Sequence, residues 1–133
     1  MKRRVFLAIN LPDGLRKRLV NWQKMHQNLS VHWTKPGSLH ITLVFIGHVT
    51  DDEVYRISQL VGEAVKKQEP FSVKIKKIVP GPSDKTARMI WLEGEPSQEI
   101  ANLKESIETA LMEKDWGGSF RKENRPLRPH VTL

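Results

Sequence analysis

The sequence predicts an α+β protein with two related halves. Two of the five histidines begin tetrapeptides of the same shape, one at residues 40–43 and one at residues 130–133. Each lies in a stretch that alternates like a β-strand, and each half of the chain repeats the order strand, helix, motif strand. A length of 133 residues is that of one domain. We therefore expect a single domain, residues 1–133, whose two lobes bring their motif strands to one central cleft.

The first half is expected to begin with a strand and a helix. Residues 4–9 form a short apolar run typical of a strand, and Pro12 marks the start of a helix. Residues 31–33 are expected to form a short strand. The apolar residues at helical spacing are Leu15, Leu19, Trp22, Met25 and Leu29.

The first motif is expected on the next strand. Pro36 and Gly37 indicate a turn, and residues 39–46 a strand that Gly47 ends. Because side chains at i and i+2 leave the same face of a sheet, His40 and Thr42 should project together. The intervening residues, which should point into the core, are Leu39, Ile41, Leu43 and Phe45.

A capping box predicts the second helix. Thr50 stands at the N-cap and Glu53 at N3. The acidic residues 51–53 complement the positive end of the helix dipole, so we assign no metal site to them. The apolar face expected on this helix consists of Val54, Ile57, Val61, Ala64 and Val65.

The second half is expected to contain two strands and a third helix before the second motif strand. Residues 71–79 alternate like a half-exposed strand that Pro80-Gly81-Pro82 ends, and residues 86–93 form the next strand. Pro96-Ser97 begins a helix that ends near residues 116–118, and the basic segment 120–129 leads to His130. The apolar face of this helix is Ile100, Leu103, Ile107, Ala110 and Leu111.

Composition and charge favour a soluble protein with an anionic partner. The chain has no cysteine, which excludes disulfides and thiolate sites and fits a cytoplasmic location, and no stretch is apolar enough for a membrane span. Lys and Arg outnumber Asp and Glu by 22 to 15, giving a net charge of +7. Nucleic acid is the natural candidate for this partner. The excess lies in two segments that contain Lys74, Lys76, Lys77, Lys85 and Arg88, and Arg121, Lys122, Arg125 and Arg128. For Lys74 and Lys76 alone, an exposed strand edge is an equally good explanation.

The His-x-Thr pattern is not specific by itself. His32 and His48 also have threonine two residues later, but Thr34 leads into a turn and Thr50 begins a helix. A half-buried structural histidine remains an alternative for His40 taken singly. The repetition on two strands favours a catalytic pair.

The two motifs, with their flanks, resemble the His-x-Thr-x signatures of the 2H phosphoesterase superfamily, and above all its RNA 2',3'-cyclic phosphodiesterase family, also called 2'-5' RNA ligase-like. The residues that carry the resemblance are Leu39-His40-Ile41-Thr42-Leu43-Val44-Phe45-Ile46-Gly47, Arg128-Pro129-His130-Val131-Thr132-Leu133, the opening run from Val5 to Pro12, and Trp33. The resemblance implies two pseudo-symmetric lobes of antiparallel sheet with helices packed outside.

The resemblance also implies an activity. RNA 2',3'-cyclic phosphate ends would be hydrolysed to 2'-phosphomonoesters, with the reverse 2'-5' ligation accessible. His40 would be the proton donor and His130 the proton acceptor, while Thr42 and Thr132 supply donors to the charged oxygens. No cofactor, metal, membrane or protein partner is expected, and the protein is expected to be a monomer.

Three alternatives remain open from the sequence. The chain ends at Leu133, whereas family members continue with an arginine and further strands, so we expect either a fragment or a lobe completed differently. Two other functions are alternatives to the hydrolysis of RNA 2',3'-cyclic phosphates. One is a non-enzymatic basic RNA-binding module, and the other is a 2H phosphodiesterase that acts on 2'-5' linkages or small cyclic nucleotides. Trp33 is either a packed residue or a surface on which a base stacks.

Overall fold

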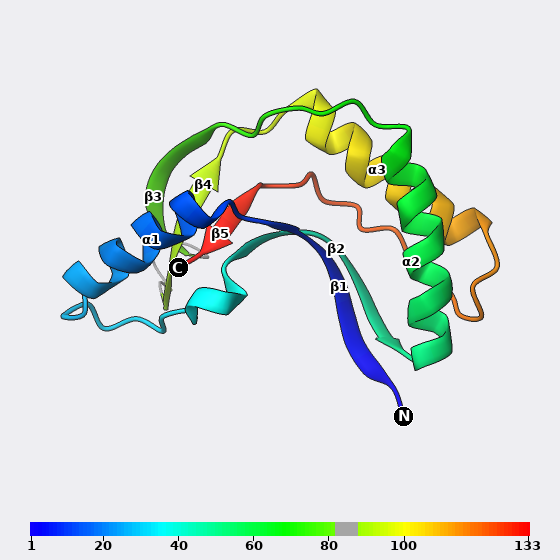
Figure 1. Ribbon diagram of the computed structural model, residues 1–133, viewed down its shortest axis with the longest axis horizontal. Coiled ribbons are helices and arrows are strands. Elements are labelled where there is room, and N and C mark those ends of the chain that lie inside the picture. Colours follow the sequence, from blue (N-terminus) through cyan, green and yellow to red (C-terminus); the bar gives the residue numbers. More distant parts are fainter. Residues whose placement is uncertain (82–87) are drawn as a thin grey trace. The chain divides into compact units, whose positions relative to one another are not determined.

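A computed structural model describes residues 1–81 and 88–133 and has an α+β fold with a five-stranded sheet, which confirms the expected class (Figure 1). The strand order is β1-β2-β5-β4-β3, and the pairs β2–β5, β5–β4 and β4–β3 are antiparallel. The elements are β1 (Arg3–Asn10), α1 (Asp13–Met25), the 3-10 turn η1 (Pro36–Ser38), β2 (His40–Val49), α2 (Asp51–Lys66), β3 (Ile75–Gly81), β4 (Met89–Gly94), α3 (Gln98–Glu113) and β5 (His130–Thr132).

The chain divides into two compact units, and each unit draws on both halves of the sequence. Unit 1 consists of Met1–Leu7, Leu43–Val73 and Pro96–Leu127. Unit 2 consists of Ala8–Thr42, Lys74–Glu95 and Arg128–Leu133. The order strand, helix, motif strand that the sequence repeats therefore does not coincide with either unit. All four residues of the two His-Thr pairs belong to unit 2.

Unit 1 contains α2 and α3, which pack side by side (Figure 1). The predicted capping box is present, because Glu53 N–H donates to Thr50 Oγ1 at 3.2 Å and Thr50 N–H donates to Glu53 Oε1 at 2.7 Å. On α2 only Ile57 is buried, and Val65, which we expected on the apolar face, is 44% exposed. The predicted face of α3 is largely confirmed, since its buried apolar residues are Ile100, Leu103, Ile107 and Leu111.

Unit 2 places its core against the inner face of the motif strands. The buried apolar residues there are Leu11, Leu19, Leu39, Ile41, Leu92, Val131 and Leu133. The predicted apolar face of α1 is only partly right, because the helix ends at Met25 and both Met25 and Leu29 are exposed. Gln23 is buried instead, and its amide donates to the carbonyls of Thr34 at 3.1 Å and Leu133 at 2.8 Å.

The first motif strand differs from the sequence prediction at its far end. Gly47 does not end the strand, because its φ of +112° lets β2 continue to Val49. The expected alternation holds from Leu39 to Leu43 and then changes phase: Val44 is buried, whereas Phe45 is 59% exposed. Phe45 therefore does not belong to the core, and its ring lies 6.1 Å from that of Phe6.

Three other strand predictions need correction. Residues 31–33 form no strand, although His32 N–H donates to the Arg88 carbonyl at 3.0 Å. β3 begins at Ile75 instead of residue 71 and runs through Pro80 to Gly81, with an irregular register between Ile75 and Lys77. β4 is described from Met89, and the predictions that fall on Pro82, Lys85 and Thr86 lie outside the described residues.

The third helix ends earlier than predicted. α3 stops at Glu113, and Trp116 is buried after it, with Nε1 donating to the Leu111 carbonyl at 2.9 Å. Within the described residues, no helix is long and apolar enough to cross a membrane.

Candidate active site

The two predicted motif strands are direct neighbours in the sheet. β2 pairs with β5 in antiparallel orientation, with Ile41 opposite Val131. In this register His40 lies opposite Thr132, and Thr42 lies opposite His130. Side chains of directly opposed residues share a face, so the four polar residues form a square on one face of the sheet. We call these four residues, His40, Thr42, His130 and Thr132, the motif square.

The two faces of this strand pair differ sharply in exposure. Ile41 is 3% exposed and Val131 is fully buried, so the apolar members point into the core as predicted. All four residues of the motif square are half-buried. They are therefore accessible to a ligand while their backbones are held by buried neighbours.

His40 is held at both ring nitrogens. Its Nδ1 lies 2.6 Å from the carbonyl oxygen of Ser38, which η1 places immediately before the strand. Its Nε2 lies 2.9 Å from Oγ1 of Thr42 on the same face. The predicted pairing of imidazole and hydroxyl is thus present within the first motif.

His130 is held by its own backbone and by an aromatic ring. Its Nδ1 lies 2.7 Å from the carbonyl oxygen of Arg128. The ring of Trp91 on β4 stacks on the imidazole, with centroids 3.9 Å apart and planes inclined by 18°. Glu93, directly opposite His130 on β4, accepts a hydrogen bond from Arg128 Nη2 at 3.1 Å.

The two Nδ1 contacts define the tautomer of both rings. A carbonyl oxygen only accepts hydrogen bonds, so Nδ1 of His40 and of His130 must carry the proton. In the neutral imidazole, Nε2 is then the nitrogen with the lone pair. Each histidine can therefore exchange a proton with a ligand only through Nε2, as a general acid or base requires.

The sequence reasoning missed the groups that orient the histidines. Ser38 and Arg128 act through backbone carbonyls, which every residue type possesses, so no sequence signal could identify them. Trp91 and Glu93 alternate on β4, and that alternation placed them on one face of a predicted strand. Only the pairing of β4 with β5, which the sequence did not define, brings that face to His130.

Two other predictions concern Trp33 and metal ligands. Trp33 packs edge-on against Trp22, with ring centroids 5.9 Å apart, which favours packing over a surface for base stacking. Among the residues that the structure describes, no group of three or more histidine, aspartate or glutamate side chains is arranged to hold a metal ion. Asp51 of the acidic trio forms an exposed ion pair with Arg3 at 3.1 Å.

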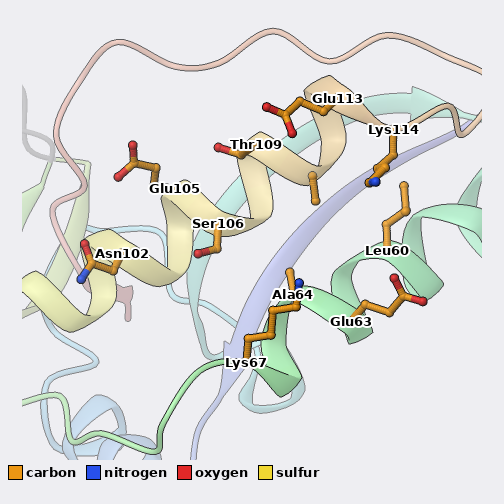
Figure 2. A pocket seen from close by; sticks show the side chains of 11 residues that line it. Leu60, Glu63, Ala64, Lys67, Asn102, Glu105, Ser106, Thr109, Glu113 and Lys114 are labelled. Atoms are coloured by element: carbon orange, nitrogen blue, oxygen red, sulfur yellow. The ribbon is translucent and has the colours of Figure 1, made fainter.

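A separate surface hollow of about 710 Å³ lies between α2 and α3 in unit 1. Figure 2 shows acidic and basic side chains along it, among them Glu63, Lys67, Glu105 and Lys114. It contains no histidine and no residue of the motif square. The hollow is therefore distinct from the motif square, which lies in unit 2.

The chain is similar in sequence to known proteins. A sequence model of the family described as LigT-like phosphoesterase matches residues 9–91. The chain is 30% identical to a protein of Methanothermobacter thermautotrophicus named RNA 2',3'-cyclic phosphodiesterase, over 100% of this chain and 71% of the relative. It is 26% identical to the Bacillus subtilis protein of the same name, over 96% of this chain and 68% of that relative.

Solved structures show the same fold. The crystal structure of Escherichia coli LigT in complex with 3'-AMP matches with a TM-score of 0.76 at 26% identity and covers 100% of this chain and 72% of that one. A structure from Thermus thermophilus matches with a TM-score of 0.82 at 24% identity, over 98% of this chain and 73% of the other. Together with the family match over residues 9–91, these similarities establish that the chain belongs to the LigT-like phosphoesterase family.

Proposed function

We propose that this protein hydrolyses RNA 2',3'-cyclic phosphate ends to 2'-phosphomonoesters, with His40 as the proton donor and His130 as the proton acceptor. The observation that carries the proposal is the motif square, in which two histidines with Nδ1 bound to carbonyls present Nε2 on one half-buried sheet face. The relatives named RNA 2',3'-cyclic phosphodiesterase support the reaction and the RNA substrate.

The reaction needs one proton acceptor and one proton donor. Water attacks phosphorus in line, Nε2 of His130 accepts a proton from it, and a new bond between phosphorus and the water oxygen forms. The bond from phosphorus to the ribose 3'-oxygen breaks, and Nε2 of His40 donates a proton to that oxygen. The products are a 2'-phosphomonoester and a 3'-hydroxyl. The family resemblance, not the geometry, supplies the assignment of the two roles.

The spacing of the motif square suits a single phosphate group. His40 and His130 are diagonal neighbours on the sheet face, a relation that places Cα atoms about 7–8 Å apart. Side chains that lean toward a common ligand from this separation can contact opposite sides of one phosphorus centre. The threonine hydroxyls, each opposite the other motif's histidine, can donate to the oxygens on which negative charge accumulates.

Charge favours RNA as the partner. The net charge of +7 attracts a polyanion, and Lys74, Lys76 and Lys77 are exposed beside or on β3, in the same compact unit as the motif square. Attack by a 5'-hydroxyl in place of water would run the chemistry backward and form a 2'-5' linkage. A monomeric state and a cytoplasmic location stay predictions.

The decisive experiment is incubation with a short RNA that bears a 2',3'-cyclic phosphate, followed by mapping of the hydroxyl that retains the phosphate. We expect a 2'-phosphate, and turnover that survives EDTA. Accumulation of a 3'-phosphate would contradict the assigned leaving group. Loss of turnover in EDTA with recovery on adding a divalent ion would show that the two-histidine mechanism is incomplete.

The same assay separates the alternatives. An RNA-binding module would retain RNA but leave the cyclic phosphate intact, and replacement of His40 would change neither property. A 2H phosphodiesterase of different specificity would cleave a 2'-5'-linked dinucleotide or a small cyclic nucleotide faster than the RNA end. Parallel reactions with these three substrates at equal concentration therefore identify the class.

A further inference from the structure

Trp91 covers one face of the His130 ring. The two rings are nearly parallel, inclined by 18°, with centroids 3.9 Å apart. The hydrogen bond from His130 Nδ1 to the Arg128 carbonyl limits rotation within the imidazole plane, and the stacked indole limits tilt out of that plane. The two contacts together fix the direction in which Nε2 points.

Gly81 provides the space that the Trp91 ring occupies. A Cβ atom built on Gly81 would lie 2.5 Å from Trp91 Nε1 and 2.6 Å from Cδ1 and Cε2. Real Cβ atoms do not approach other heavy atoms so closely, so any side chain at position 81 would displace the indole. The last residue of β3 is therefore coupled to the orientation of His130 through one tryptophan.

The indole nitrogen is not what holds Trp91 in place. Nε1 of Trp91 is buried and has no hydrogen-bond partner among the described residues. A buried donor without an acceptor lowers stability, so the polar atom does not explain the tryptophan. Two contacts of the ring are with the imidazole of His130 and with the guanidinium of Arg128, whose Cζ lies 5.5 Å from the ring centroid.

The charges around His130 come from three strands and the preceding segment. Glu93 on β4 lies opposite it and is paired with Arg128, while His40 on β2 is its diagonal neighbour and Lys77 on β3 lies opposite Glu93. The ion pair with Arg128 partly neutralises the carboxylate of Glu93. The face of Trp91 is then the contact that favours a positive ring without adding a formal charge.

We propose that Trp91 is a positioning residue that holds the His130 imidazole in its reactive orientation and stabilises the imidazolium formed when His130 accepts a proton. The inference rests on the proposed function for its catalytic part. Its geometric part, the dependence of the His130 ring on Trp91 and Gly81, stands without it.

The first test compares Trp91→Leu with Trp91→Phe on RNA that bears a 2',3'-cyclic phosphate. Leucine removes the flat ring, and a misplaced acid or base typically loses up to about 100-fold in rate, so we expect kcat to fall by about 10- to 100-fold with little change in KM. The pH profile of the coupled pair should change as well, because one of its two histidines loses its stacked partner. Phenylalanine keeps the stack and should retain most of kcat.

Gly81→Ala displaces Trp91 without touching His130 and tests the same coupling from the other side. We expect a kcat loss like that of Trp91→Leu, and little additional loss when the two are combined, because both remove one contact. The matched control is Trp22→Leu, since Trp22 stacks on His26 with centroids 4.2 Å apart but belongs to α1. That variant should keep wild-type kcat.

A structural readout separates the inference from the proposed function. The ring current of Trp91 should shift the NMR signals of the His130 ring, so Trp91→Leu and Gly81→Ala should move these signals and leave those of His26 in place. Trp22→Leu should do the reverse. If the wild-type enzyme opens the cyclic phosphate but Trp91→Leu retains its kcat and pH profile, the inference is wrong and the function stands. If the wild-type protein is inactive, the proposed function fails and unmoved His130 signals would still overturn the positioning role.

Discussion

His40 and His130 use the same backbone contact but meet different neighbours. Each Nδ1 lies within hydrogen-bonding distance of the carbonyl two residues earlier, at 2.6 Å for His40 and 2.7 Å for His130. Beyond that contact, Nε2 of His40 meets a threonine hydroxyl at 2.9 Å, whereas the ring of His130 lies under an indole. Nε2 of His40 has a hydroxyl partner on its own strand, and the ring of His130 has an aromatic partner on β4.

The difference bears on the two chemical roles that we propose for His40 and His130. The local backbone defines the tautomer in both copies, because the carbonyl two residues before each histidine accepts the Nδ1 proton. The neighbouring strands then supply the surroundings, since β4 carries Trp91 and Glu93 to His130. An acid and a base need opposite protonation states in the same step, so unlike surroundings suit the pair.

The largest expected effect is the loss of either histidine. His40→Ala and His130→Ala should each lower kcat on the cyclic phosphate RNA by about 10²- to 10⁴-fold, the usual contribution of a positioned acid or base. RNA affinity, measured by fluorescence anisotropy, should change far less. Because both residues act in one step, the double variant should lose much less than the product of the single losses.

His48→Ala is the matched control for these variants. His48 also has threonine at the second following position but is exposed and belongs to unit 1. It should retain wild-type turnover. Full activity of either His40→Ala or His130→Ala would instead make that histidine structural and favour the RNA-binding module.

The pH dependence of turnover should be bell-shaped. One histidine must be neutral and the other protonated in the reactive state. The rate therefore falls at low pH, where the base is protonated, and at high pH, where the acid has lost its proton. The two limbs belong to the pair as a coupled system. A profile measured for wild type and both single variants checks this, and a rate that rises to a plateau without a second limb would remove one histidine from the mechanism.

A smaller effect is expected from the threonines. Thr42→Val and Thr132→Val remove one donor each while keeping the shape of the side chain. A hydrogen bond to a charged group contributes about 1.5–3 kcal/mol, so kcat should fall by about 10- to 100-fold. Thr42→Ser and Thr132→Ser keep the hydroxyl and should stay near wild type. Equal losses in the serine and valine variants would show that the methyl group, not the donor, matters.

The fold was predictable where a local rule dominates. The capping box defined the start of α2, and the alternation of Leu39, Ile41 and Leu43 identified the buried face of β2. The alternation wrongly predicted that Phe45 is buried, because β2 changes phase after Leu43. This is where the chain passes from one compact unit to the other. Only tertiary packing defines which side of a strand is buried beyond such a point.

For the candidate site, the sequence indicated residues but not their arrangement. Repetition of His-x-Thr on two strands indicated His40 and His130 as candidates whose catalytic role stays a prediction. It did not show that β2 and β5 are adjacent, with Ile41 opposite Val131, since pairing between residues so far apart in sequence leaves no local signal. The stack of Trp91 on His130 depends on that same sheet order and on the missing side chain at Gly81.

The smallest expected effect concerns the third His-x-Thr sequence, His48-Val49-Thr50, whose threonine caps a helix instead of serving a reaction. Thr50→Ala should leave kcat unchanged and lower the free energy of unfolding by about 1 kcal/mol, the usual cost of losing an N-cap.

The backbone N–H of Thr50 lowers the pKa of Glu53 below its ordinary 4.5. A carboxylate with a lowered pKa stabilises the fold above its ordinary pKa, and that contribution is lost as the pH falls through the lower folded value. Urea unfolding of wild type and Glu53→Gln should therefore differ at neutral pH and converge in acid. A Thr50→Ala variant with impaired turnover and unchanged stability would contradict the distinction between this copy and the two copies that we propose to be catalytic.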